Sequence, residues 1–464
     1  MTFEPMTLGK FQEQAEPARR CVTRATFEPM PVGRSQEQAE PARQCVPGRS
    51  PGTRARRSAA ARIVISLLPL LLFGRIAFAA DWPQFRGPGS RGVSSETGLP
   101  TEFSEKTVAW KVPLPGPGPA SPIVVDGTVI VTAAGGPRQE RLHVLGIDAA
   151  NGRTRWQRTL WATGPTVCNG FGGVAASTPA SSGRLVFALF SSNDIACFDI
   201  DGNLQWYRAL GYESPRTRND VGMAASPLIA GDTIVVQLEN PGVSFATGLD
   251  TSTGETRWRV DLESGGCWTT PALWQGKSAA EDLVVLQSRV GLTAHEPQSG
   301  KQVWRLEQPC SSISSTTACG EYLFAPINGL TALRYSLQSK GFEPIWQEQR
   351  LGPANICPVV HEGRVYVTKS AGIVVCGDAA TGKVLWQLRL KGPFWGTPAI
   401  GDGHLYAANH DGLVQIVRLG KDSGELVSTG QIDSGVLASP AISGGAVYFR
   451  TNTHLWKIGH KASE

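Results

Sequence analysis

The chain has 464 residues, of which 53 are glycine, 32 are proline and 41% are hydrophobic, a composition typical of many short strands joined by tight turns. Residues 1–79 hold 12 of the 44 basic and 6 of the 39 acidic residues, so the remainder has 32 basic against 33 acidic residues and the net charge of +5 belongs to the N-terminal part. This balance gives no reason to expect nucleic-acid binding.

The first 53 residues contain a tandem duplication. The segment Thr2–Met6 recurs at Thr26–Met30, and Glu13–Arg19 recurs at Glu37–Arg43. The duplicated unit is rich in Glu, Gln, Pro and Arg and has too little apolar content to build a core. We expect residues 1–53 to result from a start site assigned too far upstream, and the alternative is a disordered extension.

Residues 54–79 have the three parts of a secretory signal peptide. Several arginines precede the apolar run Ile63–Phe73, and Ala77-Phe78-Ala79 then supplies a cleavage sequence. The apolar run is too short to span a bilayer comfortably. We therefore expect cleavage before Ala80, export to the periplasm or the medium, and no membrane span in the mature protein.

A Gly- and Pro-rich lead-in at residues 80–106 precedes a repeat whose first landmark is tryptophan. Most of these tryptophans stand four residues after a glycine that itself follows an acidic residue, as in Asp378…Gly382…Trp386, and a further copy has Ser428 in the tryptophan position. The tryptophans recur at intervals of 40–52 residues, at Trp110, Trp156, Trp206, Trp258, Trp304, Trp346 and Trp386.

A second landmark, in most copies Ser or Thr followed by Pro, begins each unit. A short apolar strand, a Gly-containing turn and another strand follow, as in Pro122–Thr132, which predicts a hairpin. The equivalent site around Thr316-Thr317 lacks proline. The other landmarks are Ser121-Pro122, Thr178-Pro179, Ser226-Pro227, Thr270-Pro271, Cys357-Pro358, Thr397-Pro398 and Ser439-Pro440.

Each unit supplies about four strands in roughly 40–50 residues, the dimensions of a propeller blade. The last unit lacks an outer strand after Leu455-Trp456-Lys457, and the strand Thr107–Val112 near the mature N-terminus is unused. We therefore predict an all-β protein, an eight-bladed β-propeller of four-stranded antiparallel blades at residues 107–458, followed by a tail at 459–464. The N-terminal strand closes the last blade, which removes an open sheet edge.

The turn-and-tryptophan pattern, as in Asp378–Trp386, resembles the tryptophan-docking motif of the PQQ-like (pyrroloquinoline-quinone-like) repeat family. That family includes quinoprotein alcohol dehydrogenases and the propeller subunit of the outer-membrane barrel-assembly machinery. The opening Asp81–Gly89 also resembles the start of secreted planctomycete-type PQQ-repeat proteins. The resemblance covers residues 107–458 and implies the fold but no cofactor, because many members bind no quinone.

The repeated tryptophans are interpreted as structural, because they stand at one place in every unit. An indole on an outer strand can fill the gap between two blades while its N–H finds a turn carbonyl. The acidic residue before each glycine is expected to accept hydrogen bonds from the backbone of its own turn.

The chain lacks parts that quinoprotein catalysis needs. The resemblance implies two adjacent cysteines beside the quinone, and the sequence has no adjacent cysteine pair and no Cys-x-x-Cys-His motif for a c-type haem. The seven histidines are scattered, and no zinc-site spacing occurs. We expect no catalytic residues, no metal and no cofactor, and the alternative is a PQQ-dependent quinoprotein dehydrogenase.

One set of positions predicts ligand binding. Segments just before the innermost strands converge on the propeller axis, where amides, carboxylates and indoles suit a small polar ligand, a peptide or a glycan. The alternative is that these side chains cap turns and fill the channel. We expect an exported, monomeric, non-catalytic scaffold that binds envelope or secreted proteins or such a ligand. The candidate residues are Asn169, Asn219, Asp220, Trp268, Asn355, Trp395 and Asp433.

Overall fold

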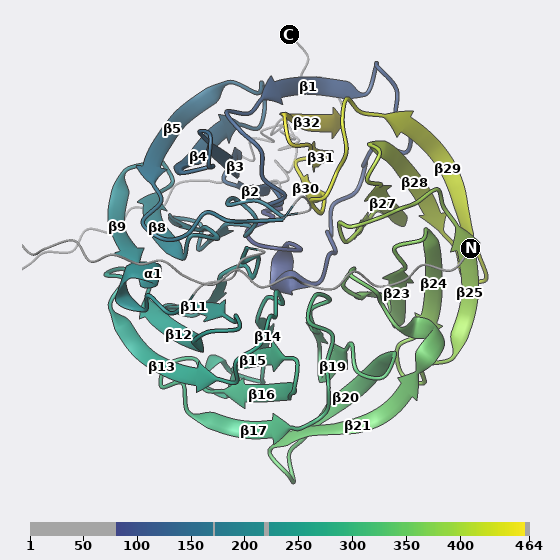
Figure 1. Ribbon diagram of the computed structural model, residues 1–464. Helices are drawn as coiled ribbons and strands as arrows, with labels where there is room; N and C mark the ends of the chain where they lie inside the picture. The colour runs from purple at the N-terminus through teal and green to yellow at the C-terminus, as the bar shows by residue number, and fades with distance from the viewer. Residues whose placement is uncertain (1–79, 170–171, 218–221, 460–464) are drawn as a thin grey trace, which may run out of the picture. The chain divides into compact units, whose positions relative to one another are not determined.

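The computed structural model describes residues 80–169, 172–217 and 222–459, so the predicted N-terminal extension and signal peptide lie outside the described residues. Within these ranges the strands form eight four-stranded antiparallel sheets, which stand radially around one axis (Figure 1). The predicted eight-bladed β-propeller is therefore confirmed.

The first four blades each use four consecutive strands, ordered from the axis outward. They are β2 (Ile123–Val125), β3 (Thr128–Gly135), β4 (Arg141–Asp148) and β5 (Thr154–Trp161); β6 (Ala180–Ser181), β7 (Leu185–Leu189), β8 (Asp194–Asp199) and β9 (Leu204–Ala209); β10 (Leu228–Ala230), β11 (Thr233–Leu238), β12 (Ser244–Asp250) and β13 (Thr256–Leu262); and β14 (Ala272–Trp274), β15 (Leu283–Ser288), β16 (Gly291–His295) and β17 (Gln302–Leu306).

Blades 5 to 7 follow the same order, and blade 8 takes its outermost strand, β1, from the N-terminal end of the propeller. These strands are β18 (Thr317–Cys319), β19 (Tyr322–Ala325), β20 (Leu330–Ser336) and β21 (Gly341–Glu348); β22 (Val359–His361), β23 (Arg364–Thr368), β24 (Ile373–Asp378) and β25 (Val384–Arg389); β26 (Ala399–Gly401), β27 (His404–Ala408), β28 (Leu413–Leu419) and β29 (Gly424–Gln431); and β30 (Ala441–Ser443), β31 (Ala446–Arg450), β32 (His454–Gly459) and β1 (Val108–Pro113).

Helical segments are short in the described ranges. The α-helix α1 (Leu210–Glu213) follows β9, and the 3-10 helices are η1 (Pro88–Ser90), η2 (Ala279–Glu281) and η3 (Gln349–Leu351). No helix in these ranges has the length and apolar character needed to cross a membrane.

The second strand of a blade and the outermost strand differ in how much of them is buried. The second strand of a blade is covered on both faces by its neighbours, so β11 is buried along its whole length and is largely apolar. The outermost strand faces solvent on one side, so from Trp258 to Leu262 of β13 every second residue is buried or partly buried and the residues between them are exposed. The hydrophobic core therefore lies between the blades, in clusters that join adjacent sheets.

Most outer-strand tryptophans pack on the turn of the next blade. The Trp156 indole covers Gly202, where a Cβ atom would come within 2.4 Å of the ring, and its Nε1 donates a 2.9 Å hydrogen bond to the carbonyl of Ile200. The carbonyl that accepts belongs to the residue after the acidic turn residue. The same bond links Trp110 to Ala149, Trp206 to Thr251, Trp258 to Pro297 and Trp346 to Ala379.

Three blade boundaries depart from this arrangement. The Trp386 ring packs on Gly424 of blade 7, but its Nε1 is buried and has no hydrogen-bond partner among the described residues. The other two departures occur where the sequence departs from the repeat. Trp304 packs edge-on against Phe342, with ring centroids 5.2 Å apart, where the next blade has lost its acidic turn. Blade 7 has Ser428 in the tryptophan position, and Phe103 of the lead-in covers Gly430 there while its backbone N–H donates to the Ser428 hydroxyl at 2.9 Å.

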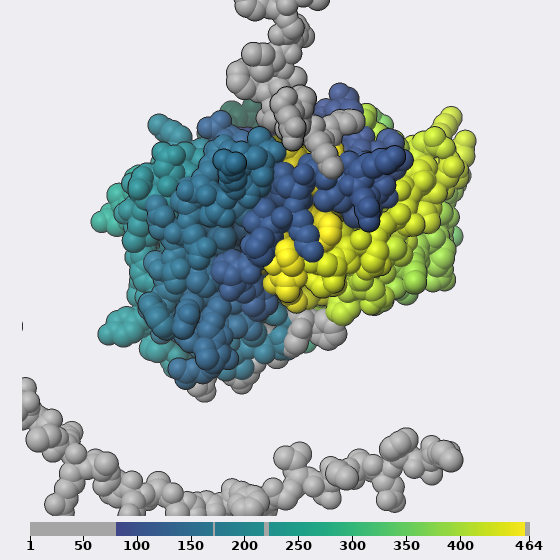
Figure 2. All heavy atoms as spheres, turned by 90° about the horizontal axis from the view of Figure 1, so that it is seen from above, coloured from purple at the N-terminus to yellow at the C-terminus, as the bar shows by residue number. Residues whose placement is uncertain are grey.

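The N-terminal strand closes the ring as predicted. β1 pairs antiparallel with β32, and Figure 2 shows the N-terminal segment in purple against the yellow C-terminal strands. Trp110 of β1 then docks on blade 1, because its indole N–H donates to Ala149 at 3.1 Å. β32 extends to Gly459, one residue beyond the predicted end of the propeller, because Gly459 still pairs with Ala446.

The lead-in at residues 80–106 crosses the face that carries the hairpins between first and second strands. Trp82 bridges to Val124 of blade 1, and Val93 bridges to Ile400 of blade 7. Between these contacts η1 lies at the centre of the ring, as the purple segment in Figure 1 shows. The lead-in thus places its own side chains on the propeller axis.

Candidate functional site

The axial cavity has a volume of about 310 Å³ and is lined by residues that precede the innermost strand of every blade, together with Phe85 of the lead-in. These segments meet at the axis because the chain passes from the outermost strand of each blade to the innermost strand of the next, always across the same face of the propeller. The lining therefore repeats with the blades, and one position contributes a side chain from each of them.

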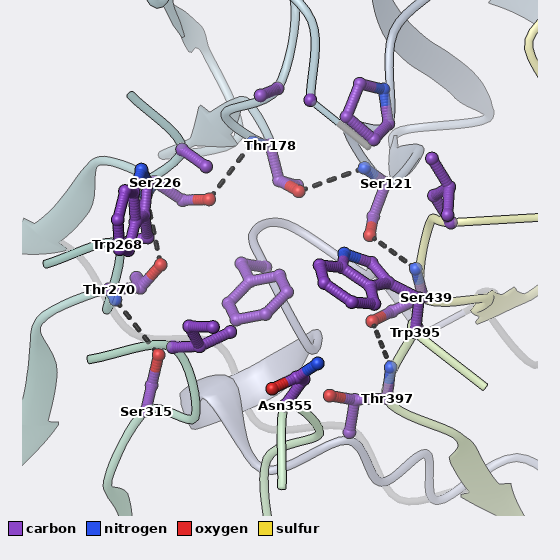
Figure 3. Close-up of a pocket in the computed structure, with 18 of the residues that line it drawn as sticks. Ser121, Thr178, Ser226, Trp268, Thr270, Ser315, Asn355, Trp395, Thr397 and Ser439 are labelled. Carbon is purple, nitrogen blue, oxygen red and sulfur yellow. Dashed lines mark hydrogen bonds between the residues drawn. The ribbon is translucent and has the colours of Figure 1, made fainter. Parts of the chain in front are cut away.

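That position forms a closed circle of hydrogen bonds, the hydroxyl ring. Each member accepts the backbone N–H of the member in the preceding blade, at 2.9–3.3 Å, and Ser439 closes the circle by donating to Ser121. Figure 3 shows most of these bonds around the cavity. The members are Ser121, Thr178, Ser226, Thr270, Ser315, Cys357, Thr397 and Ser439.

The hydroxyl ring is the part of the site that the sequence reasoning missed. Its members are the Ser, Thr or Cys residues of the second landmark, which were interpreted only as strand starts. In blade 5 the ring member is Ser315, which stands one residue before the pair Thr316-Thr317. Thr316 occupies the position that proline has in the other blades. The repetition of a hydroxyl before proline was the available signal.

Four of the seven candidate residues line the axial cavity, namely Asn169, Trp268, Asn355 and Trp395. Trp268 is half-buried, and its Nε1 donates to the carbonyl of Gly222 at 2.7 Å. Asn355 is also half-buried and points its amide into the cavity (Figure 3). Asn219 and Asp220 lie outside the described residues.

The structure corrects the axial placement of Asp433. Its carboxylate binds Lys111 at 2.9 Å and His454 at 2.6 Å, and it accepts a hydrogen bond from the Trp456 indole. The segment from β29 to β30 passes beside the closing strand before it reaches the axis, so Asp433 ties this segment to β1 and β32, the two outer strands of blade 8. Burial acts to raise the pKa of Asp433, but Lys111 and His454 outweigh it and the pKa is lowered.

The lining is neutral among the described residues. It includes no Asp, Glu, Lys, Arg or His, and no group of three or more potential metal ligands occurs in the described ranges. Apolar side chains of Met223, Ile313 and Leu437 lie among the hydroxyls and indoles. The described lining can thus hydrogen-bond to a polar group and contact an apolar one.

Comparison with known proteins gives a family match. A family model described as outer membrane protein assembly factor BamB matches residues 93–246, 216–319 and 337–453. BamB of Yersinia pestis is 27% identical over 171 residues, which are 33% of this chain and 41% of that protein. BamB of Legionella pneumophila is 31% identical over 111 residues, 23% of this chain and 27% of that protein. The alignments therefore span less than half of these relatives.

Solved structures show the same fold at low identity. Quinohemoprotein alcohol dehydrogenase from Comamonas testosteroni has a TM-score of 0.63 at 14% identity, covering 83% of this chain and 81% of that one. A europium-containing methanol dehydrogenase has 0.59 at 14%, covering 80% and 89%. BamB from Moraxella catarrhalis has 0.53 at 17%, covering 77% and 99%. Since the family match extends over well over half of the sequence, the chain belongs to the PQQ-like repeat family described as outer membrane protein assembly factor BamB.

Proposed function

We propose that this chain is an exported, non-catalytic binding propeller that holds a small polar ligand in its axial cavity and serves as a scaffold in the cell envelope. The main observation that supports this proposal is the axial cavity. Every blade contributes a polar group to it, and two blades contribute the indoles of Trp268 and Trp395. Concave sites with convergent polar groups among apolar ones are the usual form of small-molecule sites.

The alternative, that the axial side chains only cap turns and fill the channel, does not account for two features of the cavity. Side chains that only filled the axis would leave little space, whereas about 310 Å³ stays open. The Asn355 amide also has no hydrogen-bond partner among the residues that the structure describes. Both features favour an occupant that comes from outside the chain.

The scaffold part of the proposal rests on the family and on the sequence. Relatives in the family are named as assembly factors for outer membrane proteins, which supports partners among envelope proteins. Export is supported by the signal-peptide pattern at residues 54–79.

The alternative, a PQQ-dependent dehydrogenase, is tested by the donor set of the cavity. Quinoprotein chemistry needs oxygen ligands for a Ca²⁺-type ion, with carboxylates foremost, and an aspartate as general base. The described lining supplies hydroxyls and amides but no carboxylate. These residues do not fit the group, and we derive no step through it.

The proposed function is tested by ligand titration of the purified chain against a panel of glycans, short peptides and organic acids, read by tryptophan fluorescence. We expect a ligand whose signal is lost in Trp268→Ala and Trp395→Ala and kept in Trp161→Ala, because the Trp161 side chain is exposed at the end of β5. An envelope pull-down with the same variants reports on partners. Alcohol oxidation with an added dye, PQQ and Ca²⁺ would support the dehydrogenase instead.

A further inference from the structure

The hydroxyl ring keeps unused donors. Each of its seven hydroxyl oxygens accepts a backbone N–H from the neighbouring blade, as Thr178 does from Ser121 at 3.0 Å. A hydroxyl has one proton to donate besides its two acceptor positions. Among the described residues no acceptor takes these protons, although the ring side chains are almost fully buried. Seven O–H groups thus line one small cavity with their donor capacity free.

A buried arginine lies directly behind one part of the cavity lining. Arg450 is 1% exposed, and its Nη1 donates to the carbonyl of Ala120 at 2.9 Å. Ala120 lies between Pro119 and Ser121, which both line the cavity. The Nε and Nη2 atoms of Arg450 are buried and have no hydrogen-bond partner among the described residues. The guanidinium therefore carries a positive charge that its surroundings do not balance.

A second buried arginine stands behind the opposite part of the lining. Arg86 is 2% exposed and directly follows Phe85, which lines the cavity. Its guanidinium donates to the Thr317 hydroxyl at 2.6 Å and to the carbonyl of Thr316 at 3.2 Å. All of these partners are neutral, and neither Arg86 nor Arg450 forms an ion pair with a described carboxylate.

Building on the axial binding function proposed above, we propose that the axial cavity selects a small oxyanion, the carboxylate or phosphate group of a small molecule. Free donors that converge in a space of low dielectric favour a ligand group that only accepts hydrogen bonds. A bound anion would also lie within the field of two buried guanidinium groups that have no carboxylate partner among the described residues, which would reduce the cost of burying their charge. A neutral polyol would leave that charge unbalanced.

The test titrates the purified chain with inorganic phosphate and with acetate at low ionic strength, and with glucose as the neutral probe. Calorimetry gives the Kd, and loss of the fluorescence response in Trp268→Ala assigns the binding to the axial cavity. We expect an anion to bind more tightly than glucose. In Arg450→Met we expect binding at least about tenfold weaker, since one of the two buried positive charges next to the cavity lining is removed. Arg257→Met is the matched control, because Arg257 is paired with Asp232 and Asp250 away from the axis.

One position of the hydroxyl ring offers a conservative variant, because a single member is a cysteine and can be replaced by serine. Cys357 is the one ring member with a thiol, a weak donor, where every other blade has Ser or Thr. In Cys357→Ser we expect anion binding about fivefold tighter, since one hydroxyl donor is added. Anion binding that neither Cys357→Ser nor Arg450→Met changes would overturn the inference.

The two proposals fail in different ways. Glucose bound in the axial cavity in preference to both anions would leave the binding function standing and overturn the anion selectivity. If none of these probes and no member of the wider ligand panel binds there, both proposals are wrong.

Discussion

Two rings of side chains repeat once per blade in this propeller, and they differ in what they leave unsatisfied. In the outer ring an indole such as Trp156 gives its single N–H to the next blade, and its faces are covered. In the inner ring a hydroxyl such as Thr178 accepts an N–H from the neighbouring blade and keeps its own proton. Both rings join the blades, but only the inner one lines the axial cavity, where its free donors can meet a ligand.

The strongest test of the outer ring removes the strand that closes it. Deletion of residues 107–113 takes away β1, which pairs with β32, and with it Trp110, which docks on blade 1. We expect the chain to unfold or to form oligomers, because an open sheet edge and two uncovered blade faces remain. Size-exclusion chromatography and circular dichroism measure this, and a folded monomer of the deleted chain would contradict the role given to β1.

A single docked tryptophan gives the next largest effect. Trp156 is 8% exposed and packs between blades 1 and 2, so Trp156→Ala should lower the free energy of unfolding by about 3–5 kcal/mol. Trp161, on the same strand but 64% exposed, is the matched control and should change stability by less than about 0.5 kcal/mol when replaced by alanine. Urea unfolding of both variants measures the difference, and equal losses would contradict the docking role.

A buried carboxyl group and an exposed one should give opposite pH dependences of stability. Glu239 is buried between blades 3 and 4, and burial raises its pKa from an ordinary 4.5 to about 7, although a hydrogen bond from Gln237 opposes the shift. Its contribution to stability is full below pH 4.5 and is lost as the pH rises through about 7. The loss amounts to about 3 kcal/mol by pH 8.

In Glu239→Gln this decline should disappear, as urea midpoints between pH 4.5 and 8 would show. Asp232, on a surface hairpin, behaves in the opposite sense, because hydrogen bonds from Arg257 and Gln298 lower its pKa to about 2. The stability that Asp232 contributes is present near neutrality and is lost as the pH falls through that value. A wild-type decline above pH 5 that persists in Glu239→Gln would assign it to another group.

The smallest effect on stability is expected in the axial cavity. Trp268→Ala removes a half-buried indole with one hydrogen bond to Gly222, so it should cost about 1 kcal/mol or less. Ligand binding in the axial cavity should be lost at the same time. A loss of stability as large as that of Trp156→Ala would indicate that Trp268 is a structural residue.

Several features of the site could be foreseen because they follow the repeat. Asn169, Trp268, Asn355 and Trp395 all precede innermost strands, and all four line the axial cavity. Asp433 also precedes an innermost strand but binds Lys111 and His454, because it lies beside the blade that is completed by a strand from the other end of the chain. Sequence spacing cannot show which neighbour a side chain meets at that boundary.

The sequence by itself determined the eight blades, their four-stranded composition and the closing strand, because turn and tryptophan spacings are local and repeat along the chain. Only the tertiary structure decided that the landmark hydroxyls form one closed ring, that Phe103 replaces the missing tryptophan of blade 7, and that Arg86 and Arg450 are buried without a carboxylate. These features join residues hundreds of positions apart, as Ser439 and Ser121 are, and they arise when the ring closes.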